Sequence, residues 1–299
     1  MRLHPFTSNP SLLTTFLLPL AWLASGSTPL LAKLPSLNRT PWLGFFVGHS
    51  GSRGTFGIAD DGSLHYNHHS DGGSVSSGYS HHIHPAVAET MPDGSVRIRR
   101  LIPDSLKTEN SASDKPSSVT FHGEVAGGTT IEVNLTFTRR DVSIGGRIMH
   151  SKPGGNPLQF CLYTQAPAYY LSYNESETIK NGTAEQKEKL AKKTERQKNI
   201  AAKESLILRR LNGKQLSLPL LDDINLSDTA FNGEGFASIE TNLSCLKDRK
   251  IEITATEGSR MKLSNKVPRP IFKYHYNITW TQDPAAKSHD KGRMVFTTR

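Results

Sequence analysis

The sequence predicts a mainly β protein, a large antiparallel two-sheet β-sandwich with one exposed charged helix. Three observations support this fold class. Apolar and polar residues alternate with a period of two in many short segments, which is typical of half-buried strands. Asp-Gly and Asn-Gly pairs, which favour tight turns, separate several of these segments. One stretch near 184–203 differs, because its lysines, glutamates, glutamines and alanines favour a helix.

The first predicted strands are joined by glycine-containing turns. A strand at 42–47 begins the β-rich region. The turn Asp60-Asp61-Gly62 lies between segments 55–59 and 64–66. The turn Pro92-Asp93-Gly94 is placed in the same way, between segments 86–88 and 96–98. Because glycine adopts positive φ without steric penalty, both turns predict hairpins. Residues 104–118, rich in Ser, Asp and Lys, are predicted to be a solvated loop.

The clearest alternation lies in the middle of the chain. Every second residue of 130–138 is apolar and the intervening residues are polar, as in an antiparallel strand with one buried face. A turn at Arg139-Arg140-Asp141 leads into 142–149, and the alternation resumes at 158–162. This meander predicts a core that contains Ile131, Val133, Leu135, Phe137, Val142, Ile144, Phe160 and Leu162.

The predicted helix near 184–203 has few apolar residues, so we expect it to be exposed and to connect two groups of strands. Asn212-Gly213 follows between two apolar segments, which is a strong hairpin signal. Alternating aromatic residues at 272–280 predict a strand with one face in the core. Further strands are predicted at 236–241, 251–255, 261–263 and 294–297.

The N-terminal residues have the pattern of a secretory signal. Arg2 precedes a short leucine-rich segment, 12–23, and Ala24-Ser25-Gly26 supplies small residues for cleavage. We therefore expect a signal peptide at 1–26, a linker at 27–41 and a single β-rich domain at 42–299. No later stretch has the roughly 20 apolar residues of a spanning helix. The sequence predicts a secreted, periplasmic or cell-surface protein with no membrane span after cleavage.

The chain is basic, with 36 Lys and Arg against 27 Asp and Glu and a formal net charge of +9. Such a balance favours anionic partners, and an anionic polysaccharide or cell-envelope polymer is the expected one. The sequence contains no specific nucleic-acid motif and no cofactor motif, so no cofactor is predicted. Its oligomeric state is not indicated. Guanidinium groups pair well with carboxylate, sulfate and phosphate, and the candidate ligand-binding residues are Arg97, Arg99, Arg139, Arg140 and Arg147.

Histidines are concentrated between 65 and 84, which holds six of the twelve in the chain. The favoured interpretation is a solvated polar loop, because the histidine spacing matches no metallohydrolase helix motif and no carboxylate lies at a diagnostic offset. The Gly- and Ser-rich segment 72–78 also argues against a specific metal site. Two alternatives stay open, a transition-metal site and a catalytic site, since neutral imidazoles bind zinc, copper and nickel. The candidate metal ligands are His65, His68, His82 and His84.

The two cysteines, Cys161 and Cys245, are a candidate disulfide in an oxidising compartment. The bridge would close a loop of roughly 84 residues, for which the chain-entropy model gives about 4.5 kcal/mol of stabilisation. The alternative is a buried thiol that acts as a small apolar side chain.

Three functions are compatible with these features. The first is a non-catalytic binding or structural module for an anionic or carbohydrate polymer, supported by the basic charge and the β-rich pattern. The second is a secreted polysaccharide-acting enzyme with its site near the histidines of 65–84. The third is a component of a surface protein assembly that docks through the charged helix.

Overall fold

The structure is a computed structural model that describes residues 45–50, 54–59, 61–69, 75–108, 116–152, 155–165, 178, 180–219, 226, 228–242, 249–265, 276–283 and 291–299. Within these residues the protein is mainly β, and every named strand pairing is antiparallel, which confirms the predicted fold class. The predicted signal peptide, 1–26, and linker, 27–41, lie outside the described residues.

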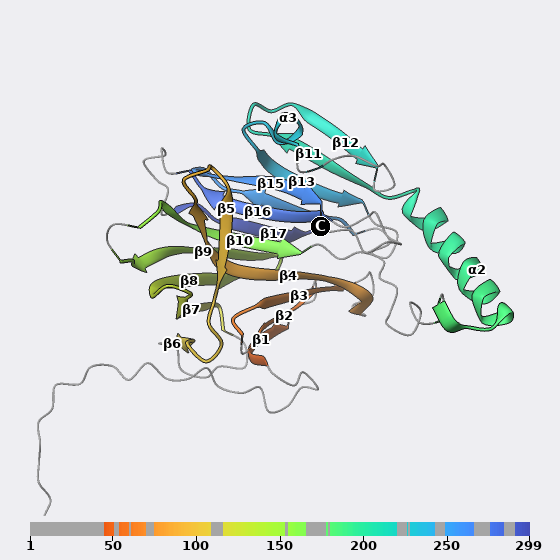
Figure 1. Cartoon of the computed structure of the whole chain (residues 1–299), viewed down its shortest axis with the longest axis horizontal. Helices are drawn as coiled ribbons and strands as arrows, with labels where there is room; N and C mark the ends of the chain where they lie inside the picture. The colour runs from red at the N-terminus through yellow and green to blue at the C-terminus, as the bar shows by residue number, and fades with distance from the viewer. Residues whose placement is uncertain are drawn as a thin grey trace, which may run out of the picture. The chain divides into compact units, whose positions relative to one another are not determined.

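The strands form two layers that pack against each other (Figure 1). The first layer follows the pairing order β1, β2, β3, β4, β10, β16, β15, and β5 pairs with the end of β4. Its strands are β1 (Phe45–Ser50), β2 (Gly54–Ala59), β3 (Leu64–His69), β4 (Val75–Thr90), β5 (Val96–Arg100), β10 (Leu158–Gln165), β15 (Ser259–Asn265) and β16 (Tyr276–Gln282).

The second layer follows the pairing order β6, β7, β8, β9, β17, β14, β13, β11, β12. Part of the predicted loop at 104–118 forms its edge strand β6. Its strands are β6 (Lys107–Thr108), β7 (Ser118–Val125), β8 (Thr129–Phe137), β9 (Asp141–His150), β11 (Ser205–Arg210), β12 (Gln215–Pro219), β13 (Phe236–Asn242), β14 (Ile251–Ala255) and β17 (Met294–Thr298).

The two layers belong to one curled, continuous sheet, and this differs from two separate sheets. Two pairings link the layers, that of Phe236 on β13 with Met261 on β15 and the bridge between Leu101, after β5, and Val125 on β7. Strand twist accumulates across so many strands that an open sheet of this size curls until its apolar faces meet. The fold is therefore sandwich-like in its packing, although its hydrogen bonding is continuous.

Aromatic and polar contacts cross from one layer to the other and show that the apolar faces meet. The rings of Phe56 on β2 and Phe137 on β8 have centroids 5.3 Å apart. Tyr66 on β3 lies edge-on to Phe296 on β17, with centroids 5.9 Å apart. The eight residues predicted for the core are all buried, and so are the three aromatic-face residues Tyr276, Ile278 and Trp280.

The predicted turns and the helix are confirmed. Gly62, Gly94 and Gly213 lie in hairpin connections with φ between 77° and 83°. Helix α2 (Ala184–Ala201) matches the predicted helix and leads into β11, and a short helix α3 (Thr229–Asn232) precedes β13. Among the described residues, no helix is both long and apolar enough to cross a membrane.

Candidate binding surfaces

The histidine segment forms two paired strands, so its interpretation as a solvated loop is wrong for the described part. His65 on β3 lies opposite His82 on β4, and Tyr66 lies opposite His81. Because successive side chains of a strand point to opposite faces, this register divides the histidines. His65, His82 and His84 lie on the outer face of the first layer, whereas His68 and His81 lie in the core.

The inner histidines form a buried hydrogen-bonded pair. Nε2 of His68 lies 2.8 Å from Nδ1 of His81, and both side chains are fully buried. The ring of Tyr66 contacts His68, and Phe296 contacts His81, with centroid distances of 4.2 and 5.3 Å. Burial, together with the neighbouring His82, lowers the pKa of His81 to about 3. His81 is therefore neutral at physiological pH.

The outer histidines lie beside a carboxylate and a serine. The rings of His65 and His82 have centroids 4.3 Å apart. Nε2 of His65 lies 3.0 Å from Oγ of Ser63, and this hydroxyl donates to Oδ1 of Asp61 at 2.6 Å. Burial, followed by repulsion from His82, lowers the pKa of His65 to about 4 although Asp61 opposes this shift.

The order of these contacts argues against a nucleophilic serine. Although burial alone would raise it, the pKa of Asp61 is lowered by hydrogen bonds from Ser63, so the carboxylate is ionised. Ser63 has one proton, which it donates to this carboxylate, and it therefore accepts a hydrogen bond from His65. A triad requires the reverse arrangement, in which the imidazole accepts the serine proton.

The four candidate metal ligands do not converge. His68 lies in the core, whereas His65, His82 and His84 lie on the outer face of the same strands. His68 is three positions after His65 on the same strand, so its side chain points to the opposite face from that of His65. In the part of the chain that the structure describes, no group of three or more His, Cys, Asp or Glu side chains could hold a metal ion.

The outer face of the first layer extends from the histidines across four strands. His84 on β4 is paired in register with Tyr163 on β10, which is paired with Thr279 on β16 and, through it, with Lys262 on β15. Arg100, on β5, interacts electrostatically with both His84 and Tyr163. Sequence reasoning missed this arrangement, because the four paired strands are far apart in the chain.

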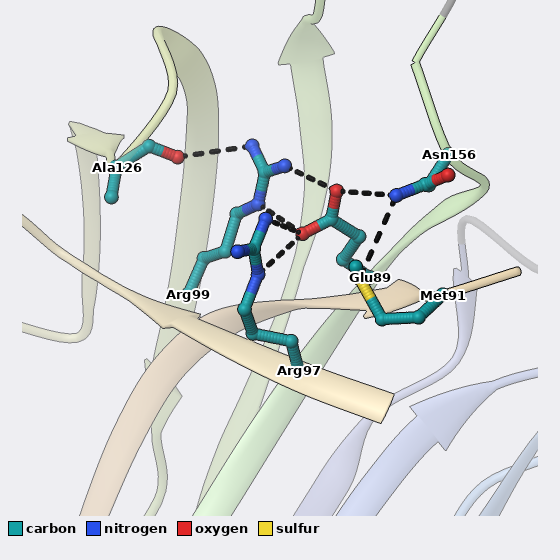
Figure 2. A network of polar contacts seen from close by, with 6 residues as sticks. All are labelled: Glu89, Met91, Arg97, Arg99, Ala126 and Asn156. Atoms are coloured by element: carbon teal, nitrogen blue, oxygen red, sulfur yellow. Dashed lines mark hydrogen bonds and ion pairs between the residues drawn. The ribbon is translucent and has the colours of Figure 1, made fainter. Parts of the chain in front are cut away.

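Arg97 and Arg99 both bind the carboxylate of Glu89 (Figure 2). Nε of each guanidinium donates to Oε2 at 2.8 Å, and a second nitrogen of Arg99 donates to Oε1. Asn156 donates to Oε1 at 3.0 Å. The hydrogen bond from Arg99 is the main reason why the pKa of Glu89 is lowered to about 2. These two candidate ligand-binding arginines are therefore paired within the protein.

The other candidate arginines lie elsewhere. Arg147 on β9 donates to both carboxylate oxygens of Glu132 on β8, at 3.1 and 3.3 Å, and His122 lies 3.2 Å from the same carboxylate. Arg139 and Arg140 lie exposed in the turn between β8 and β9. The five candidates thus occupy three places and do not make one cluster.

The exposed side of helix α2 carries a row of cations. Lys189, Lys192, Lys193 and Arg196 are all exposed, and their spacing of three and four residues places them on one side of the helix. Glu185 and Glu188 lie on the same side, so the four cations outnumber the two carboxylates there. Leu190 is buried on another side. An ion pair at 2.7 Å joins Lys192 to Glu188, and both side chains are mostly exposed.

Cys161 is fully buried on the outer side of β10, next to Ala86 and Ala88. Burial raises the pKa of its thiol to about 12, so this side chain is unreactive in the folded protein. Cys245 lies outside the described residues, and the bridge between Cys161 and Cys245 stays a prediction.

No protein-family model and no curated protein matches this sequence. Among solved structures, the chain is similar to the α-N-acetylgalactosaminidase NagBb of Bifidobacterium bifidum in complex with GalNAc, with a TM-score of 0.44 and 10% sequence identity. The match covers 85% of this chain but 36% of that enzyme, so the chain spans about a third of its length. This likeness assigns no activity to the present chain.

Proposed function

We propose that the protein is an exported, non-catalytic module that binds an anionic polymer, with an acidic polysaccharide of the cell envelope as the expected ligand. The observation that carries this proposal is the cationic side of helix α2, formed by Lys189, Lys192, Lys193 and Arg196. Export rests on the signal-like pattern of residues 2–26.

The geometry of α2 suits a linear polyanion. At a rise of 1.5 Å per residue, the row from Lys189 to Arg196 extends about 10 Å along the helix axis. The pair between Lys192 and Glu188 is solvent-exposed, so it holds Lys192 only weakly. A polymer with repeated negative charges can therefore contact several of these cations at once.

The paired arginines of the sheet support α2 as the contact surface. Arg97 and Arg99 share the carboxylate of Glu89, and Arg147 is paired with Glu132. An external anion would have to compete with these carboxylates for the three arginines, and the four exposed cations of α2 are therefore the contact surface that we propose.

The proposal is tested by binding to immobilised heparin and polygalacturonate across a range of salt concentrations. We expect retention at low salt that weakens as salt rises, because screening reduces attraction between exposed charges. The variant K189Q/K192Q/K193Q/R196Q should lose most of this retention. The matched control K107Q/K214Q/K291Q/R209Q removes the same number of exposed cations elsewhere and should be retained like the wild type. Absence of wild-type binding at low salt, or an equal loss in both variants, would overturn the proposal.

A second candidate function is hydrolysis of such a polymer, favoured by the contact of Asp61, Ser63 and His65 beside His82. These groups place the carboxylate of Asp61 and the imidazole of His65, both of lowered pKa, on one face beside the imidazole of His82. Release of reducing ends from polygalacturonate by the wild type, but not by H65A/H82A, would replace the binding proposal with this one.

A further inference from the structure

The outer face of the first layer carries a row of side chains that cross four adjacent strands. The row consists of His84, Tyr163, Thr279 and Lys262, which occupy register-paired positions on β4, β10, β16 and β15. Neighbouring strands lie about 4.8 Å apart, so the row is about 14 Å long. This length suits an extended oligomer better than a single small ring.

The chemistry of the row changes along its length. Lys262 is exposed at one end, and Arg100 is exposed beside His84 at the other. Tyr163 lies between them and is partly exposed. Burial raises the pKa of Tyr163 although Arg100 opposes the shift, so its phenol is neutral and can donate a hydrogen bond. The row therefore has an aromatic ring and hydroxyl groups between two cations.

We propose that the row of His84, Tyr163, Thr279 and Lys262 binds an acidic oligosaccharide segment. This inference rests on the proposed polymer-binding function and names a second contact surface for the same ligand. The ring of Tyr163 packs against the apolar face of a sugar, as amphipathic aromatic side chains do at binding surfaces. Thr279 and His84 hydrogen-bond hydroxyl groups, and Lys262 and Arg100 pair with carboxylate or sulfate groups.

The residue types favour a sugar over a single-stranded nucleic acid. Nucleic acids carry one phosphate per nucleotide and bind grooves in which cations follow the backbone continuously. Here the cations lie at the ends, and the positions between them and in the next row are neutral hydrogen-bonding groups such as Thr279 and Gln165. Such groups match the hydroxyls of a sugar.

The row also predicts that binding strengthens as the pH falls. Burial, Arg100 and His82 lower the pKa of His84 although Asp61 opposes them, so His84 is neutral without ligand at pH 7. The charged or titratable groups that face this region are His65, His82, Asp61, Arg100 and Tyr163. A bound anion favours the protonated imidazole, and by linkage each unit of increase in the pKa of His84 strengthens binding by up to about tenfold at acid pH.

The test uses titration calorimetry with oligogalacturonate, at pH 7.5 and at pH 5.5. We expect Y163A to bind roughly tenfold more weakly than the wild type, which corresponds to the loss of about 1.4 kcal/mol of contact. The control Y163F keeps the ring and should bind nearly as well. The variant H84Q should bind with the same affinity at both pH values, whereas the wild type should bind more tightly at pH 5.5.

Two comparisons separate this inference from the proposed function. The α2 variant K189Q/K192Q/K193Q/R196Q should still bind the short oligomer through the row. If polymer retention persists in the wild type while Y163A and Y163F bind the oligomer equally, the assignment of the row as a binding surface is wrong. The proposed function then stands. Equal affinity for a neutral galactose oligomer, or for an oligothymidylate, would also overturn the acidic-sugar assignment. Unfolding midpoints measured for each variant identify any that fails to fold.

Discussion

Glu89 on β4 and Arg99 on β5 form a two-pronged ion pair at the end of the core, and Arg99 also reaches the opposite layer. Its Nη1 donates to the carbonyl of Ala126, in the turn between β7 and β8, at 3.1 Å. Gly127 is required beside this contact, because a Cβ there would lie 2.3 Å from the same nitrogen and φ is +96°. The pair thus connects the two layers where the apolar core ends (Figure 2).

We expect Glu89→Gln to lower the denaturant midpoint of unfolding. The substitution keeps the size of the side chain but removes the charge that binds Arg97 and Arg99. The largely buried Arg99 then lies beside a neutral amide, and the loss of the charged partner of a largely buried guanidinium is destabilising. Glu132→Gln is the matched control, because its partner Arg147 is half exposed and solvent compensates part of the loss. Equal midpoints for the two variants would contradict this account.

Substitutions of Arg97 and Arg99 should differ in their effect on stability, because the two side chains differ in exposure. The side chain of Arg99 is 18% exposed and that of Arg97 is 59% exposed. Lysine cannot reproduce the two-pronged geometry of a guanidinium, so Arg99→Lys should destabilise the protein more than Arg97→Lys. Chemical unfolding of both variants under one condition provides the comparison.

The buried pair of His68 and His81 predicts a loss of stability at mildly acid pH. The pKa of His81 falls from an ordinary 6.5 to about 3 on folding. Between these values the unfolded chain binds more protons than the folded chain. The contribution of His81 to the free energy of unfolding is therefore fully present above pH 6.5 and decreases as the pH falls toward 3. For a fully buried group the total effect is a few kcal/mol.

The acid loss from His81 can be separated from that of Glu89. The pKa of Glu89 falls from 4.5 to about 2, so its contribution is complete above pH 4.5 and is lost only below that. Unfolding midpoints at pH 7.5 and pH 5 should therefore differ strongly in the wild type and less in His81→Gln. His150→Gln, at an exposed position, should follow the wild type. Parallel profiles for wild type and His81→Gln would exclude the buried pair as the cause.

Local periodicity was enough to predict most of the fold. The alternation in 130–138 depends only on neighbouring residues, and it identified the buried face of β8 correctly. The glycines at 62, 94 and 213 predicted three turns for the same reason. The pairing of Phe236 with Met261 was not predictable, because no local pattern reports which distant strand lies beside β13.

The candidate surfaces of the sheet were harder to predict because they combine strands that are distant in the sequence. His84, Tyr163 and Lys262 share one face only because β4, β10, β16 and β15 are neighbours. One signal for the Glu89 network was present in the sequence. Glu89 continues the alternation of Ile83, Pro85 and Val87, so a charged residue stands at a core-facing position. Such a residue needs a buried partner, and the nearby arginines were the available ones.

Asn232, at the end of α3, takes the place of a neighbouring strand for part of β15. Its amide nitrogen donates to the carbonyl of Leu263 at 2.9 Å, and its carbonyl accepts from the amide of Leu263 at 2.7 Å. Asn232→Ala leaves these buried backbone groups without their partner, and each such group costs about 1–3 kcal/mol. We expect a lower unfolding midpoint, with a smaller loss for Asn212→Ala in the exposed turn. A midpoint equal to that of the wild type would contradict the role of Asn232.

Gly146 on β9 leaves room for the ring of Phe160 from the opposite layer and for the backbone of the neighbouring strand β8. A Cβ at this position would lie 2.3 Å from the carbonyl oxygen of Glu132 and 2.5 Å from the ring of Phe160 on β10. Both neighbours are held in place, one by the backbone and one by the core. Gly146→Ala should therefore destabilise the protein by about 1–3 kcal/mol, as overpacking does. The adjacent Gly145→Ala is the control, because the nearest atoms to its Cβ belong to the side chain of Arg293, which can shift more easily than backbone. We expect the ordering wild type, then Gly145→Ala, then Gly146→Ala in denaturant midpoint, and a reversal of the two variants would show that the layers are not in close contact at Phe160.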